Sequence, residues 1–91
     1  MSQTKSVLII GRRDPTEAMR VAAGLTIFGH QPSIVFTVVV PETPANEDMA
    51  ELLEFSDVES KTTVISGGAL SEISAETLAT AILEADEVIN I

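Results

Sequence analysis

Residues 6–29 read SVLIIGRRDPTEAMRVAAGLTIFG, and this stretch decides the fold class. It opens with an unbroken apolar run, which is typical of a short strand covered on both faces of a parallel sheet. Gly11 then allows a turn, Asp14 can cap a helix, and Pro15 fits the first helical position. A buried strand that leads directly into a capped helix predicts the start of a β-α-β crossover.

The rest of the chain repeats this alternation of strand and helix. The expected strands are Lys5–Ile10, Ser33–Val40, Lys61–Ile65 and Glu87–Ile91. The expected helices are Pro15–Phe28, Glu47–Phe55 and Ala75–Ala85, with Asn46 as cap of the second and Ser71 or Ser74 as cap of the third. This pattern predicts a single α/β domain over residues 1–91, a three-layer α/β/α sandwich with a mostly parallel four-stranded sheet. Its expected strand order is the flavodoxin-like 2-1-3-4.

Composition excludes several classes of function. The chain has no cysteine, so disulfides, thiolate metal sites and cysteine nucleophiles are excluded. The net charge is −9, and residues 21–91 hold Lys61 against twelve acids. Such a surface repels phosphate, so we expect neither nucleic acid nor an anionic membrane as partner, although it can either solubilise the protein or dock a basic one. Because no apolar run resembles a signal peptide or a membrane span, we expect a cytoplasmic protein.

The helix expected at 15–28 is unusually apolar. One stripe should face the sheet and consists of Ala18, Val21, Ala22, Leu25 and Phe28. A second stripe, formed by Met19, Ala23 and Ile27, fits either a wider core contact or a subunit interface. Leu70 and Ile73 are apolar residues of an expected loop and complete the candidate interface. Met49, Leu52, Leu53 and Phe55 form the expected apolar face of the second helix, and Leu78, Ile82 and Leu83 that of the third.

Two loops are candidate ligand sites. Gly11, Arg12 and Arg13 lie beside a helix N-terminus, where backbone N–H groups and the helix dipole attract anions, although a simple cap with solvated arginines also fits. The second loop, Ser66-Gly67-Gly68, follows the third strand and is either an anion nest or a plain tight turn. In the expected strand order, both loops leave the carboxyl ends of the strands at the switch point of the sheet.

No residue pattern indicates catalysis, a metal or a cofactor. Ser66 would need a general base as nucleophile, and the only histidine, His30, follows the far end of the first helix. A single histidine without cysteine is also a poor metal ligand set. We therefore expect no catalytic residue, no metal site and no cofactor.

Residues 5–40, KSVLIIGRRDPTEAMRVAAGLTIFGHQPSIVFTVVV, and residues 64–74, VISGGALSEIS, resemble the DsrE/DsrF/DsrH-like superfamily. This superfamily includes the TusB, TusC and TusD sulfur-relay subunits, and its active members carry sulfur as a persulfide on a cysteine after the third strand. The matching position is approximately Ser66, whose hydroxyl cannot hold a persulfide.

The resemblance therefore implies a non-catalytic DsrE-like protein with a structural or partner-binding role. Such a subunit would assemble with DsrE-like chains into a homo- or hetero-oligomer of the sulfur-relay type. The alternative function is a binder of a small anion or nucleotide-type ligand, which would use the loops after the first and third strands.

Overall fold

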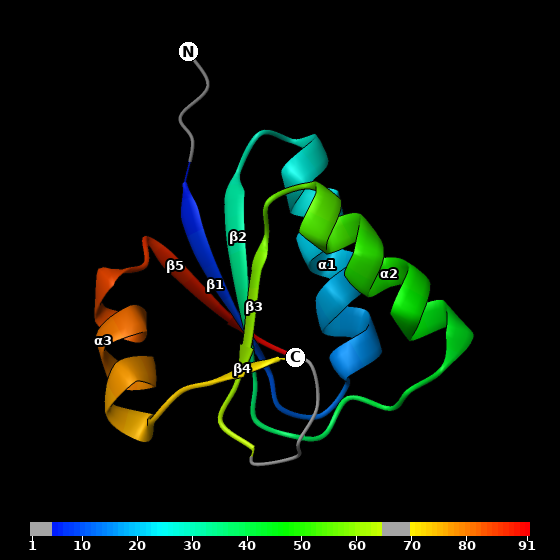
Figure 1. Cartoon of the computed structure of the whole chain (residues 1–91). Coiled ribbons are helices and arrows are strands. Elements are labelled where there is room, and N and C mark those ends of the chain that lie inside the picture. The colour runs from blue at the N-terminus through cyan, green and yellow to red at the C-terminus, as the bar shows by residue number, and fades with distance from the viewer. Residues whose placement is uncertain (1–4, 65–69) are drawn as a thin grey trace.

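A parallel five-stranded sheet forms the centre of the protein, with strand order β4-β3-β2-β1-β5 (Figure 1). The computed structural model describes residues 5–64 and 70–91. The strands are β1 Ser6–Gly11, β2 Gln31–Phe36, β3 Glu59–Thr62, β4 Ser71–Glu72 and β5 Glu87–Asn90. The helices are α1 Pro15–Ile27, α2 Pro44–Phe55 and α3 Ala75–Glu84. The predicted α/β class is confirmed: the four expected strands are present, and the two-residue β4 adds a fifth at one edge.

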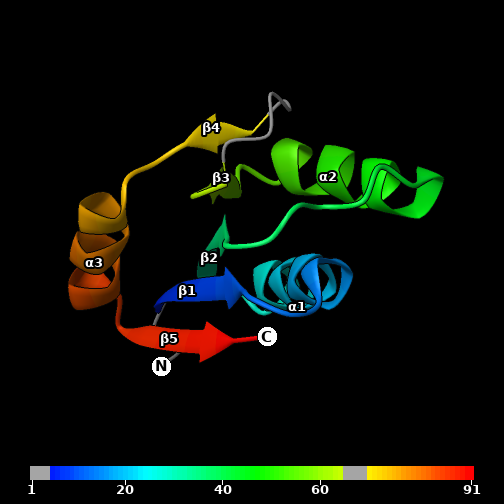
Figure 2. The ribbon, with the colours of Figure 1, turned by 90° about the horizontal axis from the view of Figure 1, so that it is seen from below.

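The strand order differs from the predicted 2-1-3-4. β3 pairs with β2, and β1 lies between β2 and β5. The reason is that α1 and α2 both lie on one face of the sheet, so each crossover moves the chain one strand further in the same direction (Figure 2). The connection through α3 uses the opposite face and brings the chain back to the far side of β1. The switch point of the sheet therefore lies between β1 and β5.

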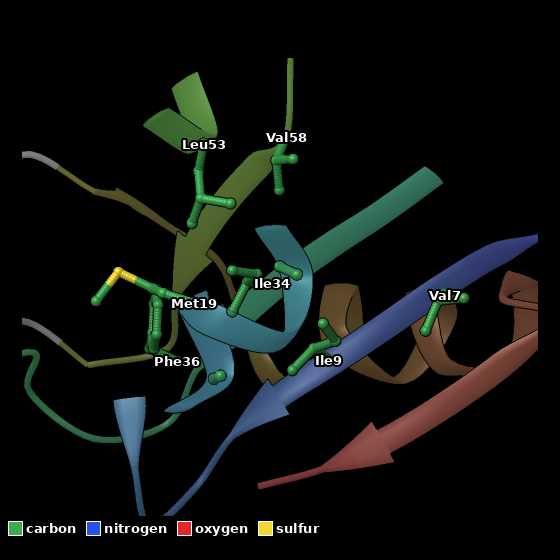
Figure 3. Packing of buried hydrophobic residues seen from close by; sticks show 9 residues of the cluster. Val7, Ile9, Met19, Ile34, Phe36, Leu53 and Val58 are labelled. Carbon is green, nitrogen blue, oxygen red and sulfur yellow. The ribbon is translucent and has the colours of Figure 1, made fainter. Parts of the chain in front are cut away.

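The two faces of the sheet carry separate cores. Val7, Ile9, Ile34 and Phe36 point to the α1/α2 face, where they pack with buried side chains of both helices and with Val58 (Figure 3). On the α3 face, the buried residues are Leu8, Ile10 and Val35. This alternation along β1 and β2 follows the period of two that a strand imposes on its side chains.

β2 begins earlier and ends earlier than predicted. Pro32 is tolerated inside it because its missing N–H falls on the β3 side, where pairing starts only at Ser33 opposite Glu59. Beyond Phe36, the Thr37 amide still donates to the Gly11 carbonyl at 3.0 Å, but β3 has ended by then. The β-branched residues 37–40 therefore lack a neighbouring strand. The strand expected at 61–65 is likewise displaced to Glu59–Thr62, after a turn in which Asp57 has φ +59°.

The helix caps agree with the sequence signals except in α2. The Asp14 carboxylate accepts a hydrogen bond from the Glu17 amide at 3.0 Å, and Gly29, at φ +82°, follows the end of α1. Ser74 caps α3 by accepting from the Thr77 amide, whereas its competitor Ser71 belongs to β4. α2 starts three residues before the predicted Glu47 and is capped by Thr43 instead of Asn46. Pro44 explains the early start, because proline fits the first helical turn.

Several apolar side chains that were expected to face the sheet are exposed. Phe28 lies just beyond α1 and is solvent-exposed, as are Leu52 and Phe55 of α2. On α3, Ile82 and Leu83 are exposed, and Leu78 alone of its expected apolar face packs against a core cluster. Leu53 is the fully buried anchor of α2.

Candidate functional site

The loop after β1 lies at the carboxyl edge of the sheet, at the switch point between β1 and β5. The main-chain oxygen of Ile91 accepts hydrogen bonds from the amides of Arg12, at 2.8 Å, and of Arg13, at 2.9 Å. The Asp14 carboxylate is in turn occupied by the Glu17 amide. The amides expected to hold an anion are therefore engaged within the protein. What the loop offers a ligand is the pair of exposed guanidinium groups, which form no salt bridge with any described residue.

Gly11 has a packing role at this loop. A Cβ at this position would meet Cδ1 of Phe36 at 2.8 Å and the Ala18 Cβ at 3.4 Å. Only glycine lets the end of β1 approach β2 and α1 this closely. Of the predicted ligand residues, Gly11 thus positions the loop, and Arg12 and Arg13 present charge.

The second predicted loop, Ser66-Gly67-Gly68, lies outside the described residues. The carboxyl ends of β1 and β3 are not adjacent, because β2 lies between the two strands, whereas the predicted strand order made them neighbours.

A hollow of about 680 Å³ opens beside the carboxyl ends of β2 and β3, on the α1/α2 face. We call it the apolar hollow. Its apolar lining comes from Met19, Phe36, Ala50, Leu70 and the run Val38–Pro41. Its polar lining comes from Glu42, Asn46, Glu47, Ser60 and Thr62. Open α/β sheets bind their ligands at this edge, and the volume is in the range of small-molecule sites.

Asn46 fixes one wall of the apolar hollow. Its side chain is buried, donates from Nδ2 to the Pro41 carbonyl at 2.9 Å, and accepts at Oδ1 from the Thr16 hydroxyl at 2.8 Å. One amide thereby ties α1, α2 and the segment before α2 together. Because every buried polar side-chain atom among the described residues has a partner, this wall is satisfied without a ligand.

Thr62 fixes the opposite side at the end of β3. Its buried hydroxyl donates to the Phe36 carbonyl at 3.1 Å and accepts from the Val64 amide at 3.0 Å. Buried and part-buried hydrogen bonds on both sides indicate a preformed hollow rather than one that must open for a ligand.

The five predicted interface residues lie in different environments. Met19 is 3% exposed and belongs to the core, and Ala23 packs against the same cluster. Thr16, Met19 and Ala23 follow each other at helical spacing, and Thr16 contacts α2 directly, so the second apolar stripe of α1 faces α2. Leu70 and Ile73 pack against the two core clusters. Ile27 alone of the five is largely exposed, at 83%.

Ile27 is one of several large apolar side chains that are exposed where α1 and α2 end. Phe28 follows it, and α2 ends with Leu52 and Phe55, which is 90% exposed. The ends of α1 and α2 are neighbours, since Thr26 and Ser56 line one shallow pocket at the amino edge of the sheet. We call Ile27, Phe28, Leu52 and Phe55 the helix-end patch. The sequence signal for it was available: Leu52 and Phe55 share a face of α2 different from that of Met49 and Leu53.

Among the described residues, Glu17 and Arg20 are the titratable groups with a resolved change in pKa. The hydrogen bond from Arg20 lowers the pKa of the Glu17 carboxyl, and the same contact raises the pKa of the Arg20 guanidinium. This is a solvent-exposed pair within one turn of α1. Over residues 5–64 and 70–91, histidines and carboxylates form no group that could hold a metal ion. No helix in this part of the chain has both the length and the apolar character to cross a bilayer.

Comparisons with known proteins inform the fold alone. No protein-family model and no curated protein matches the sequence. Among solved structures, the chain is similar to the crystal structure of the yeast protein YNL200c, with a TM-score of 0.55 and 19% sequence identity. The match covers 68% of this chain but 28% of the yeast chain, so it corresponds to a minor part of that protein. At this identity, the likeness places the chain in the α/β fold class and says nothing about its activity.

Proposed function

We propose that this protein is a DsrE-like subunit without a sulfur-carrying cysteine, whose role is to bind partner subunits. The observation that carries this proposal is the helix-end patch, where Ile27, Phe28 and Phe55 are each at least 79% exposed. Large apolar side chains gathered on neighbouring elements mark interaction sites more often than they mark free surface. The absence of cysteine is consistent with a binding role, because a persulfide needs a thiol.

The alternative, a small-anion site at the loop after β1, has weaker support. Its main-chain amides donate to Ile91, and the chain as a whole is strongly acidic. An anion would have to bind through two solvated guanidinium groups, which gives little specificity. Partner binding is therefore the function that the geometry supports best.

The test is the solution mass of the full chain, measured by light scattering on a size-exclusion column at two protein concentrations. We expect an oligomer of DsrE-like chains, first detectable as self-association of this chain. Ile27→Asp with Phe55→Asp should reduce it to the monomer. Leu83→Asp is the matched control, because Leu83 is equally exposed but lies on α3. Since Glu51 and Glu54 lie on α2 beside the patch, added salt should strengthen the association.

A monomeric wild-type protein at both concentrations and at high salt contradicts self-association. If the oligomer persists in the double variant but is lost with Leu83→Asp, the interface lies on α3. Either result would remove the helix-end patch from the proposal.

A further inference from the structure

The apolar hollow is a second feature that partner binding does not use. It lies at the carboxyl edge of the sheet, whereas the helix-end patch lies at the opposite ends of α1 and α2. Its walls are held by the hydrogen bonds of Asn46 and Thr62, two buried polar side chains. A preformed apolar cavity with a few polar groups at its rim is the usual form of a small-molecule site.

The charged groups of the hollow are all negative. Glu42 and Glu47 are the only ionisable residues among its described lining, and both are exposed at its rim. No lysine, arginine or histidine of the described residues lines it. A bound anion would meet two carboxylates and no counter-charge.

The start of α2 does not offset this charge. Helix N-termini favour anions through free amides, but Pro44 has no N–H. The Asn46 amide donates to the Thr43 hydroxyl at 3.2 Å, and the Glu47 amide donates to the Thr43 carbonyl at 2.9 Å. Pro44 thus supplies no donor and the Asn46 and Glu47 amides are engaged, which leaves the Ala45 amide against the two carboxylates of the lining.

We propose that the apolar hollow binds a small organic cation with an apolar body, such as an aromatic amine. The ring or chain packs between Phe36, the Val38–Pro41 run and Ala50, and the ammonium group lies at the rim between Glu42 and Glu47. Both parts of the ligand then have a counterpart: apolar surface is removed from water, and the charge stays half-solvated beside opposite charge. The ligand class follows from the lining and does not depend on the proposed oligomer.

The experiment compares two probes with the same indole body and opposite charge, tryptamine and indole-3-acetate. Each is titrated into the full-length, isotope-labelled protein while amide chemical shifts are followed. Tryptamine should shift the amides of Phe36, Val39 and Ala50 and bind about tenfold more tightly than indole-3-acetate. Shifts confined to the helix-end patch, or an equal affinity for both probes, would overturn the proposal.

Two sets of variants locate the binding. The double variant Glu42→Gln with Glu47→Gln should abolish the preference for tryptamine. The control Asp48→Asn with Glu51→Gln removes two negative charges from α2 at positions outside the lining, so the preference should remain. Ala50→Phe should fill the hollow and block both probes, with Ala79→Phe on the exposed surface of α3 as control. If the control pair weakens tryptamine as much as the rim pair does, the attraction comes from net charge and the site is refuted.

Discussion

The two faces of the sheet are covered very differently. On one face, α1 and α2 bury Ala18, Met19, Ala22 and Leu53 in a core shared with the sheet. On the other face, α3 is the only helix among the described residues, and none of its side chains is buried. Its Leu78 and Ala81 pack on Leu8, Ile10 and Val35, while Leu83 points to solvent.

The two faces of the sheet should therefore contribute unequally to the stability of the protein. Hydrophobic stabilisation scales with the apolar area removed from water, so most of it comes from the α1/α2 face. α3 contributes little packing and should open at a lower free energy than α1 or α2. Substitutions matched in chemistry and placed on the two faces measure this difference directly.

The largest effect is expected for a pair of leucines. Leu53→Ala on α2 should lower the free energy of unfolding by about 2–5 kcal/mol, because it leaves a cavity in the core. Leu83→Ala on α3 should change it by less than about 0.5 kcal/mol, since that side chain is 86% exposed. Urea denaturation followed by circular dichroism measures both values. Equal losses would show that α3 is packed as firmly as α2.

A pair of glycines tests the close packing on the α1/α2 face. Gly11→Ala places a methyl group against Phe36 and should destabilise the protein by about 1–3 kcal/mol. Gly24→Ala, within α1, meets no atom within 4 Å and should stabilise by about 0.5–1 kcal/mol. Thermal unfolding of the two variants should therefore shift in opposite directions. A neutral Gly11→Ala would mean that Phe36 has room to move.

A pair of threonines compares hydrogen bonds on the two sides. Thr62→Val keeps the shape of the side chain but leaves the Val64 amide without its acceptor, for a loss of about 1 kcal/mol. Thr80→Val removes an exposed bond to the Glu76 carbonyl, which water replaces, so the change should be below about 0.5 kcal/mol. Chemical denaturation gives both numbers. A larger loss at Thr80 would contradict the ranking of the faces.

The smallest effect concerns the first turns of α1 and α3. The pKa of Glu17 is lowered in the folded protein, so its ionised carboxylate stabilises the fold. This contribution to the free energy of unfolding is fully present above the unfolded pKa of about 4.3 and is lost as pH falls through the folded pKa. The stability difference between wild type and Glu17→Gln should thus be constant near neutral pH and shrink in acid. Glu76→Gln, in the first turn of α3, is the control, because it measures how much the interaction with the helix dipole alone contributes to stability. A difference unchanged down to pH 3 would rule out ionisation of Glu17 as the cause.

The local signals for α1 were reliable, although the predicted cap of α2 was wrong, and signals that depend on neighbours in space failed more widely. Asp14, Pro15 and Gly29 mark the ends of α1 correctly because capping involves residues a few positions apart. The strand order could not be read in the same way, because it depends on which face each helix takes. Residues 37–40 have strong strand propensity but no strand beside them, so β2 ends at Phe36.

The position of the loop after β1 was predictable from the sequence, but its hydrogen bonds and the apolar hollow were not. The loop after β1 lies at the carboxyl edge, as expected, but its amides are engaged by Ile91, a residue at the other end of the sequence. The apolar hollow was missed because α1, α2, β3 and the Val38–Pro41 run each supply part of its wall. One sequence signal for it was present. The apolar run continues past the strand to Pro41 and Pro44, and apolar side chains outside a sheet are expected to pack against other parts of the chain or a ligand.

The pairing of β1 with β5 has a consequence for the order of folding. The Ser6 amide bonds to a residue 80 positions later, and β1 pairs with β5 but also with the nearby β2. Closing a long loop costs more chain entropy than closing a short one, so the unit β1-α1-β2 should assemble first and β5 should dock late. Until that step, the Arg12 and Arg13 amides have no Ile91 oxygen to bind. The loop that leads into α1 is thus completed by one of the last contacts to form.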